Sequence, residues 1–208
     1  MIVSPSIASG DPLRIAQELD FIDKYFDSVH IDIEDGNAVR NISFGFKTAI
    51  AVCDYSVSSD KTMHLEVTNP LEYIDKIKQC KVDAVFIQAD ALSDPVFVTR
   101  RMIEEGIPTG VNLSNLDMGK PYLEELLEMT DDVLVNTTHH DDPAQICDEA
   151  MLDYALRLAA EGKKVWIDGG ITAEIFERHK DSDIYAAVMG RGVFGNKEKA
   201  IETLARKH

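Results

Sequence analysis

The sequence predicts a (β/α)₈ barrel made of a single domain that spans residues 1–208. Short apolar stretches of strand length alternate with amphipathic stretches of helix length along the whole chain, which is typical of a parallel sheet. Eight such units follow one another, and none carries the signal of an antiparallel strand. Eight parallel strands favour closure into a barrel. A doubly wound open sheet is the alternative that this pattern leaves open.

The eight units have regular boundaries. Strands are expected within residues 2–7, 28–33, 61–67, 82–87, 109–113, 133–137, 164–167 and 185–189. Helices are expected within residues 13–26, 48–53, 71–79, 95–105, 121–129, 150–160, 173–179 and 197–206. In the first helix, Asp11 is expected to act as the N-cap, with Pro12 at the first helical position. Because residues 84–87 are continuously apolar, their strand is expected to be buried on both faces.

The composition excludes several classes of partner. With 45% apolar and 28% charged residues, the chain resembles an ordinary globular domain with a full core. The formal net charge of −16 excludes nucleic acid and anionic membranes as main partners, because both require a basic surface. An anionic substrate must therefore be captured by a few local groups.

The cysteines and the N-terminus indicate a cytoplasmic protein. Cys53, Cys80 and Cys147 are widely spaced, so neither a disulfide framework nor a cysteine zinc site is expected. The segment from Met1 to Pro5 lacks the basic start of a secretory signal. No apolar run approaches the roughly 18 residues that a membrane span requires.

The stretch between Ser28 and Gly36 carries the most informative side chains, because an apolar run there holds one histidine and three acids. Residues of a strand alternate between its faces, so His30, Asp32 and Glu34 share the face opposite the β-branched residues. Burial of unpaired charges is costly, so this face is expected to hold a cation or to contact water. An edge strand with a solvated face is the other interpretation.

Further polar side chains stand where other predicted strands end, which is where barrels of this type place their functional groups. His64 and Glu66 end the third strand, and Asp168 ends the seventh. Together with His30 and Asp32, His64 and Asp168 could converge on one divalent ion through nitrogen and oxygen ligands. Such a donor set suits Zn²⁺, Mn²⁺, Fe²⁺ or Co²⁺.

The last two strands run into glycine-rich turns, Gly169-Gly170 and Gly190-Arg191-Gly192. Free backbone N–H groups and a helix N-terminus often bind phosphate at this point of a barrel. Tight turns alone are the alternative reason for these glycines. Arg191 favours anion binding, because a guanidinium can hold a phosphate or a carboxylate through two parallel hydrogen bonds.

Several ordered segments resemble the ribulose-phosphate 3-epimerase family along nearly the whole chain. They are Ser4-Pro5-Ser6-Ile7-Ala8-Ser9, His30-Ile31-Asp32-Ile33-Glu34-Asp35-Gly36, Asn41-Ile42-Ser43-Phe44-Gly45, Met63-His64-Leu65, Val165-Trp166-Ile167-Asp168-Gly169-Gly170-Ile171 and Gly190-Arg191-Gly192-Val193-Phe194. The resemblance implies a ribulose-phosphate-binding type of (β/α)₈ barrel that is usually a homo-oligomer. It also implies an isomerase that inverts carbon 3 of a ketopentose 5-phosphate.

The resemblance also implies roles for individual positions. The family's metal ligands correspond to His30, Asp32, His64 and Asp168, and its two acid/base carboxylates correspond to Asp32 and Asp168. Removal of the proton at carbon 3, next to the ketone, would give an enediolate whose charge a divalent metal stabilises. Two carboxylates on opposite faces of that carbon could then invert it.

The substrate-binding positions follow in the same way. Ser6 falls in a motif that contacts the substrate, and the phosphate cradle includes Gly170, Gly190 and the position of Arg191, beside Gly169.

The sequence departs from the family pattern in two regions, and Ile33-Glu34-Asp35 together with Gly190-Arg191 is interpreted as the mark of a paralogue with a different sugar. Glu34 and Glu66 stand where the family usually has methionines near the metal. The family's glycine-rich phosphate loop after the sixth strand is replaced by residues 139–145, in which Pro143 lacks a backbone donor. Arg191 is expected to compensate for that loss.

Three functions fit these residues. The leading hypothesis is a metal-dependent 3-epimerase of ribulose 5-phosphate or of a related ketopentose or ketohexose phosphate. A Schiff-base aldolase or a decarboxylase is disfavoured, because Lys61 and Lys164 sit at strand starts. A metal-dependent aldolase stays open, since it also stabilises an enediolate. A sugar-phosphate-binding or regulatory paralogue without turnover is the third hypothesis, motivated by Glu34, Glu66 and the altered loop.

Overall fold

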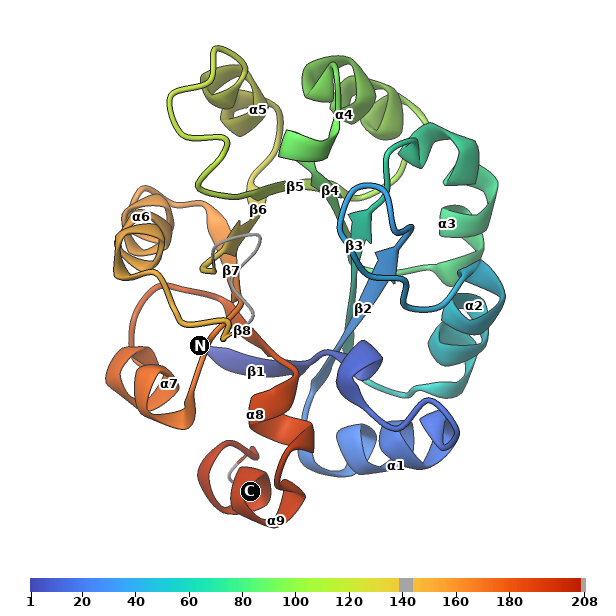
Figure 1. Ribbon diagram of the computed structural model, residues 1–208, viewed down its shortest axis with the longest axis vertical. Coiled ribbons are helices and arrows are strands. Elements are labelled where there is room, and N and C mark those ends of the chain that lie inside the picture. The colour runs from blue at the N-terminus through green and yellow to red at the C-terminus, as the bar shows by residue number, and fades with distance from the viewer. Residues whose placement is uncertain (139–143, 207–208) are drawn as a thin grey trace.

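The computed structural model describes residues 1–138 and 144–206, and it confirms the barrel (Figure 1). The strands are β1 (Ile2–Pro5), β2 (Ser28–Glu34), β3 (Asp60–Glu66), β4 (Ala84–Gln88), β5 (Thr109–Leu113), β6 (Asp132–Asn136), β7 (Lys164–Asp168) and β8 (Ala186–Met189). All neighbouring strands are parallel, in the order β1-β8-β7-β6-β5-β4-β3-β2. A parallel bridge between Ser6 and His30 links the end of β1 to β2 and nearly closes the ring. The open-sheet alternative is therefore wrong.

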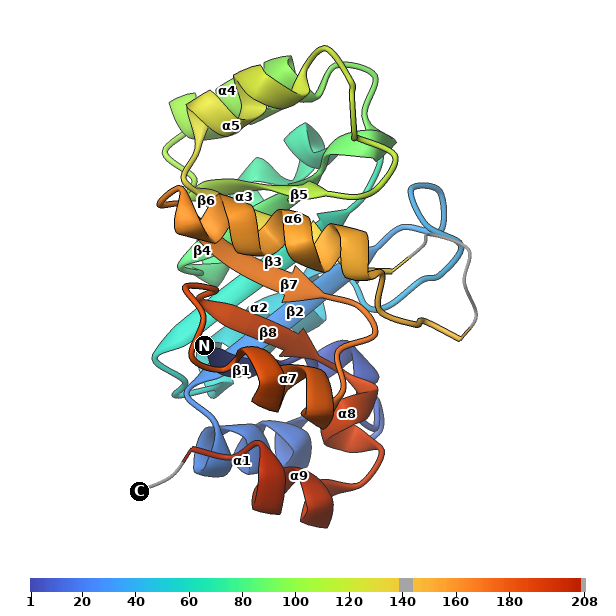
Figure 2. The same ribbon diagram turned by 90° about the vertical axis from the view of Figure 1, so that its left-hand side faces the viewer.

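The helices form an outer ring around the strands (Figures 1 and 2). They are α1 (Ile15–Tyr25), α2 (Phe46–Tyr55), α3 (Ile74–Cys80), α4 (Pro95–Glu104), α5 (Leu123–Met129), α6 (Glu149–Ala160), α7 (Ala173–His179), α8 (Arg191–Phe194) and α9 (Lys197–Thr203). Short 3₁₀ turns lie at Ile7–Ser9, Pro70–Tyr73 and Ala89–Ala91. Among the described residues, no helix is both long enough and apolar enough to cross a membrane.

Two apolar layers hold the barrel together. The larger one lies between the strands and the helices and includes Val29, Ile31 and Ile33 of β2. The smaller one fills the barrel interior, where the rings of Phe86 and Trp166 meet edge to face with centroids 4.9 Å apart. The alternation of side chains along β2 therefore directs its polar residues toward the barrel interior.

Several element boundaries differ from the sequence-based predictions, and one short helix was not predicted. The first helix does not begin at Pro12, because Asp11 forms a turn: its carboxylate accepts from the backbone N–H of Leu13 at 3.0 Å, and its carbonyl from that of Arg14 at 2.9 Å. The fifth predicted helix starts at Leu123 rather than at Pro121. Helix α8 was not predicted, since its four residues are too few to show an apolar period.

Candidate metal centre and active site

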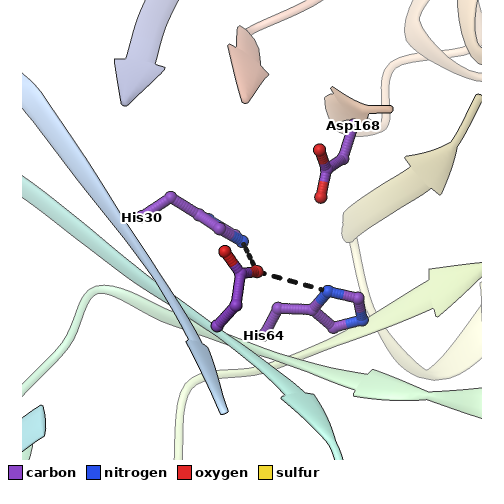
Figure 3. A group of neighbouring side chains, drawn as sticks. His30, His64 and Asp168 are labelled. Carbon is purple, nitrogen blue, oxygen red and sulfur yellow. Dashed lines mark ion pairs between the residues drawn. The ribbon is translucent and has the colours of Figure 1, made fainter. Parts of the chain in front are cut away.

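The side chains of His30, Asp32, His64 and Asp168 converge at the C-terminal ends of the strands. One possible ligand atom from each lies within 4.8 Å of the others. Asp32 Oδ1 is 3.1 Å from His30 Nε2 and 3.7 Å from His64 Nδ1. Asp32 and His64 are direct neighbours on β2 and β3, while Asp168 points at the group from β7 (Figure 3). The structure thus brings together all four side chains that the sequence singled out.

Three of the converging atoms are buried and form ion pairs, but they make no hydrogen bond within the described part of the chain. They are His30 Nε2, Asp32 Oδ1 and His64 Nδ1. Buried polar atoms normally have a partner, so a shared missing partner is expected between them. Imidazole nitrogens and carboxylate oxygens are suitable ligands for a divalent transition metal or zinc, and the set fits such an ion.

The two carboxylates of the group differ in their electrostatic surroundings. Burial alone would raise the pKa of Asp32, but His30 and His64 outweigh it and hold that pKa well below its usual range. Burial, followed by the charge of Asp32, raises the pKa of Asp168 to about 6. One carboxylate is therefore kept ionised, while the other retains its proton more readily.

A second acidic pair lies next to this group. Glu34 and Glu66 are opposite each other on β2 and β3, and Glu66 Oε1 is 3.4 Å from His64 Nδ1. Burial, opposed by His64 and reinforced by Asp32 and Glu34, raises the pKa of Glu66 to about 8. Burial lowers the pKa of an imidazole, yet Glu66 and Asp32 raise that of His64 to about 9. Two negative charges opposite each other on neighbouring strands destabilise a sheet, and a cation at the centre would reduce this repulsion between Glu34 and Glu66.

Three of the four converging side chains are also held by a hydrogen bond on the side away from the centre. His30 Nδ1 is 2.7 Å from Thr62 Oγ1, and His64 Nε2 is 2.8 Å from Gln88 Oε1. The hydroxyl of Ser6 donates to Asp32 Oδ2. Sequence reasoning did not identify Thr62 or Gln88. The available signal was a polar residue on the inward face of an otherwise apolar strand.

A pocket of about 890 Å³ opens over the group. The residues predicted to bind substrate or phosphate all line it, and they are Ser6, Gly169, Gly170, Gly190 and Arg191. The Arg191 side chain is exposed, and its Nη2 donates to the carbonyl of Ala144 at 3.2 Å. The replaced loop at residues 139–145 falls largely outside the described residues, since 139–143 are among those not described.

The glycine turns after β7 and β8 bring the backbone very close to neighbouring segments. A Cβ on Gly170 would lie 2.4 Å from the backbone nitrogen of Cys147, and one on Gly190 would lie 2.1 Å from Ser9 Oγ. Gly170 also has a φ of +70°, which side-chain-bearing residues rarely adopt. These turns therefore leave backbone groups at the pocket wall uncovered by side chains.

Replacing Gly170 by alanine is expected to distort this wall. The added methyl must displace the backbone at Cys147 and occupy a left-handed conformation, which together cost at least about 1 kcal/mol of stability. Urea unfolding would measure the loss, and a binding titration with inorganic phosphate is expected to show weaker binding. Gly162→Ala is the matched control, because Gly162 also has a positive φ but no neighbour within 4 Å of its added methyl. Equal phosphate binding by both variants would contradict the prediction that the turn at Gly170 helps to bind phosphate.

A comparison with known families gives the chain its class. The model described as "Ribulose-phosphate 3 epimerase family" matches residues 2–194. The chain belongs to the ribulose-phosphate 3-epimerase family. Membership confirms the resemblance seen in the sequence segments, and it makes the protein a member of a family of isomerases that act on carbohydrates.

Two curated members of the epimerase family illustrate a match over almost the full length of both proteins. The ribulose-phosphate 3-epimerase of Bacillus subtilis (strain 168) is 27% identical over 212 residues, covering 97% of this chain and 97% of that protein. The ribulose-phosphate 3-epimerase of Mycobacterium leprae (strain TN) is 24% identical over 216 residues, covering 99% of this chain and 94% of that protein. The likeness therefore extends over all eight units of the barrel.

Solved structures that resemble this epimerase-family chain confirm the fold alone. An N-(5'-phosphoribosyl)anthranilate isomerase from Pyrococcus furiosus superposes with a TM-score of 0.62 at 18% identity, covering 98% of this chain and 96% of that one. A chain of the tryptophan synthase complex from Pyrococcus furiosus gives a TM-score of 0.67 at 19% identity, with coverages of 98% and 97%.

Proposed function

We propose that the protein is a metal-dependent 3-epimerase of a ketose phosphate, with ribulose 5-phosphate or a related ketopentose or ketohexose phosphate as substrate. The observation that carries this proposal is the convergence of two histidines and two aspartates, in which buried atoms of His30, Asp32 and His64 have no hydrogen bond among the described residues. Family membership and the two curated ribulose-phosphate 3-epimerases described above support the same chemistry.

His30, Asp32, His64 and Asp168 would hold the divalent ion, for which Zn²⁺, Mn²⁺, Fe²⁺ and Co²⁺ are the candidates. When bound, such an ion supplies Lewis-acid stabilisation of the negative charge that develops as the substrate enolises. Thr62 and Gln88 hold the outer nitrogens of the two imidazoles, which orients the inner nitrogens toward the centre.

Asp32 and Asp168 would exchange the proton at carbon 3. They come from β2 and β7 and approach the centre from different sides (Figure 3 shows Asp168). A carbon held between them can lose its proton to one carboxylate and receive a proton from the other on the opposite face, which inverts it. The opposite pKa shifts suit one acceptor and one donor. Ser6 orients Asp32 by donating to its second oxygen.

The phosphate of the substrate would bind at the turns after β7 and β8. Gly169, Gly170 and Gly190 line the pocket there, so their backbone N–H groups are the candidate donors, and Arg191 supplies a positive charge in a chain of formal charge −16. The substrate's phosphate would thus be bound by a few local groups, because the negative net charge of the whole chain repels an anion. The resemblance further predicts a homo-oligomer, and the cysteines and the N-terminus predict a cytoplasmic location. Chromatography with light scattering would test the first prediction, and cell fractionation would test the second.

The test is proton exchange in D₂O. The metal-loaded protein is incubated with ketopentose and ketohexose phosphates, and NMR follows replacement of the proton on carbon 3 by deuterium. Exchange at carbon 3 with formation of the epimer is expected for one of these sugars. A three-carbon cleavage product would favour a metal-dependent aldolase. Tight sugar-phosphate binding without exchange of any proton would favour a binding protein and contradict the proposal.

Replacing Arg191 by methionine is expected to weaken substrate binding with little change in turnover. A charge-assisted hydrogen bond to phosphate contributes about 1.5–3 kcal/mol, so KM is expected to rise roughly 10–100-fold while kcat stays close to the wild-type value. Arg100→Met is the matched control, because Arg100 pairs with Glu125 on the outer helices. A fall in kcat with an unchanged KM would show that Arg191 does not act by holding the phosphate.

A further inference from the structure

A chain of hydrogen bonds leads from His64 outward through the ends of β4 and β5. His64 Nε2 is 2.8 Å from Gln88 Oε1, and Gln88 Nε2 donates to Asp90 Oδ1 at 2.7 Å. Asp90 Oδ2 in turn accepts from the hydroxyl of Ser114 at 2.6 Å. This series of hydrogen bonds therefore connects His64, a proposed metal ligand, to the carboxylate of Asp90 through the side-chain amide of Gln88.

The far end of this chain is firmly anchored. The backbone N–H of Ser114 donates to Asp117 Oδ2 at 2.7 Å, and the hydroxyl of Tyr122 donates to Asp117 Oδ1 at 2.7 Å. Gln88, Ser114 and Asp117 are each at most 1% exposed. Buried partners with short bonds on both sides leave the Asp90 carboxylate little freedom to turn away from Gln88.

The Asp90 carboxylate determines which way the Gln88 amide points. A carboxylate only accepts hydrogen bonds, so the NH₂ group of Gln88 must face Asp90. The reverse orientation would place two oxygen acceptors 2.7 Å apart. The amide oxygen therefore faces His64, where it can only accept, and His64 Nε2 must carry the hydrogen. Its neutral imidazole then has the lone pair on Nδ1.

We infer that Asp90, acting through Gln88, fixes His64 in the tautomer whose Nδ1 is free to bind the metal. Nδ1 is the atom that faces Asp32 Oδ1 and has no hydrogen bond among the described residues. Gln88 and Asp90 are thus positioning residues, and this assignment rests on the proposed function in that it presumes a metal at the centre. His30 differs, because the Thr62 hydroxyl beside it can rotate to donate or accept.

The test uses two variants. The first removes the constraint on which groups donate and accept between position 90, position 88 and His64, and the second restores it. In Asp90→Asn, the new amide can donate to Gln88, so the Gln88 amide can reverse and offer its NH₂ group to His64. The double variant Gln88→Glu with Asp90→Asn has nearly the same shape and the same net charge as the wild type. Its carboxylate at position 88 accepts from His64 and from the amide at position 90, which restores the original direction.

The readout is the dissociation constant for Co²⁺, titrated alone against a competing chelator, together with the histidine ¹⁵N shifts of the Zn²⁺-loaded protein. Asp90→Asn is expected to weaken Co²⁺ binding roughly 10–100-fold, and the double variant is expected to recover most of that loss. In the wild type and the double variant, the ¹⁵N shifts are expected to show the hydrogen of His64 on Nε2. Asp94→Asn is the matched control, because Asp94 caps α4 by accepting from Phe97 and asparagine caps equally well.

Equal Co²⁺ affinity in Asp90→Asn and the wild type would overturn this inference while leaving the proposed function intact. So would a double variant that binds Co²⁺ as weakly as the single one, because that result would indicate a structural role for the carboxylate itself. A wild-type protein that binds no divalent ion would overturn both the inference and the proposed function. Thermal melting of all variants separates a loss of folding from a loss of metal affinity.

Discussion

Replacing Asp168 by asparagine is expected to lower the rate of proton exchange at carbon 3 by at least about 100-fold, and by up to about 10⁴-fold. Asparagine preserves the shape of the side chain but can neither take up nor release a proton at neutral pH. Burial and Asp32 raise the pKa of Asp168, which marks it as the more readily protonated of the two carboxylates. Deuterium incorporation followed by NMR measures the loss.

Two further measurements separate the acid/base role of Asp168 from its role as a ligand. The variant is assayed at saturating metal, and its metal content is determined, so that incomplete loading does not appear as a chemical defect. Asp131→Asn is the matched control, because the Asp131 side chain is 87% exposed and pairs with Lys163 on the outside of the barrel. Near wild-type exchange in fully loaded Asp168→Asn would contradict the acid/base assignment.

Metal affinity is expected to fall as the pH is lowered from 9 to 6. In the metal-free protein, Glu66 and Asp32 raise the pKa of His64 to about 9 against the effect of burial, so His64 binds a proton over this range. A metal ligand must be deprotonated, so the ion has to displace that proton. Each unit of pH below 9 is then expected to weaken binding about tenfold, or about 1.4 kcal/mol. Calorimetry in two buffers of different ionisation enthalpy measures the proton released.

Glu66→Gln tests the cause of this pH dependence. The charge of Glu66 is the largest influence that raises the pKa of His64, so its removal is expected to shift the onset of proton competition to lower pH. The readout is the pH at which affinity stops rising, because the absolute affinity also changes when a nearby negative charge is lost. An affinity that is constant between pH 6 and 9 in the wild type would contradict the proposed electrostatics.

Much of the fold could be predicted because the strand and helix periods differ so clearly. The alternation of Val29, Ile31 and Ile33 with polar residues assigned one face of β2 to the helices, and the structure confirms it. Element ends were harder to predict, because they depend on hydrogen bonds that the sequence does not display. Asp11 resembles a helix cap in sequence, yet its carboxylate accepts from Leu13 in a separate turn before α1.

The candidate site also has a part that could be predicted from the sequence and a part that could not. His30, Asp32, His64 and Asp168 could be grouped from sequence because parallel strands deliver their last residues to one end of a barrel. The contact between His64 and Gln88 could not be predicted from the sequence, because it depends on how the side chains of two adjacent strands meet. The same holds for Asp90, whose bond to Gln88 forms in the 3₁₀ turn that follows β4.

The most direct test of a shared metal centre is anomalous diffraction from crystals of the protein saturated with one candidate ion. Data collected on both sides of the absorption edge of that ion are expected to give a single peak between His30 Nε2, Asp32 Oδ1, His64 Nδ1 and the carboxylate of Asp168. Absence of any peak there, with the four side chains turned apart or bonded to other groups, would contradict the proposed metal-dependent epimerase.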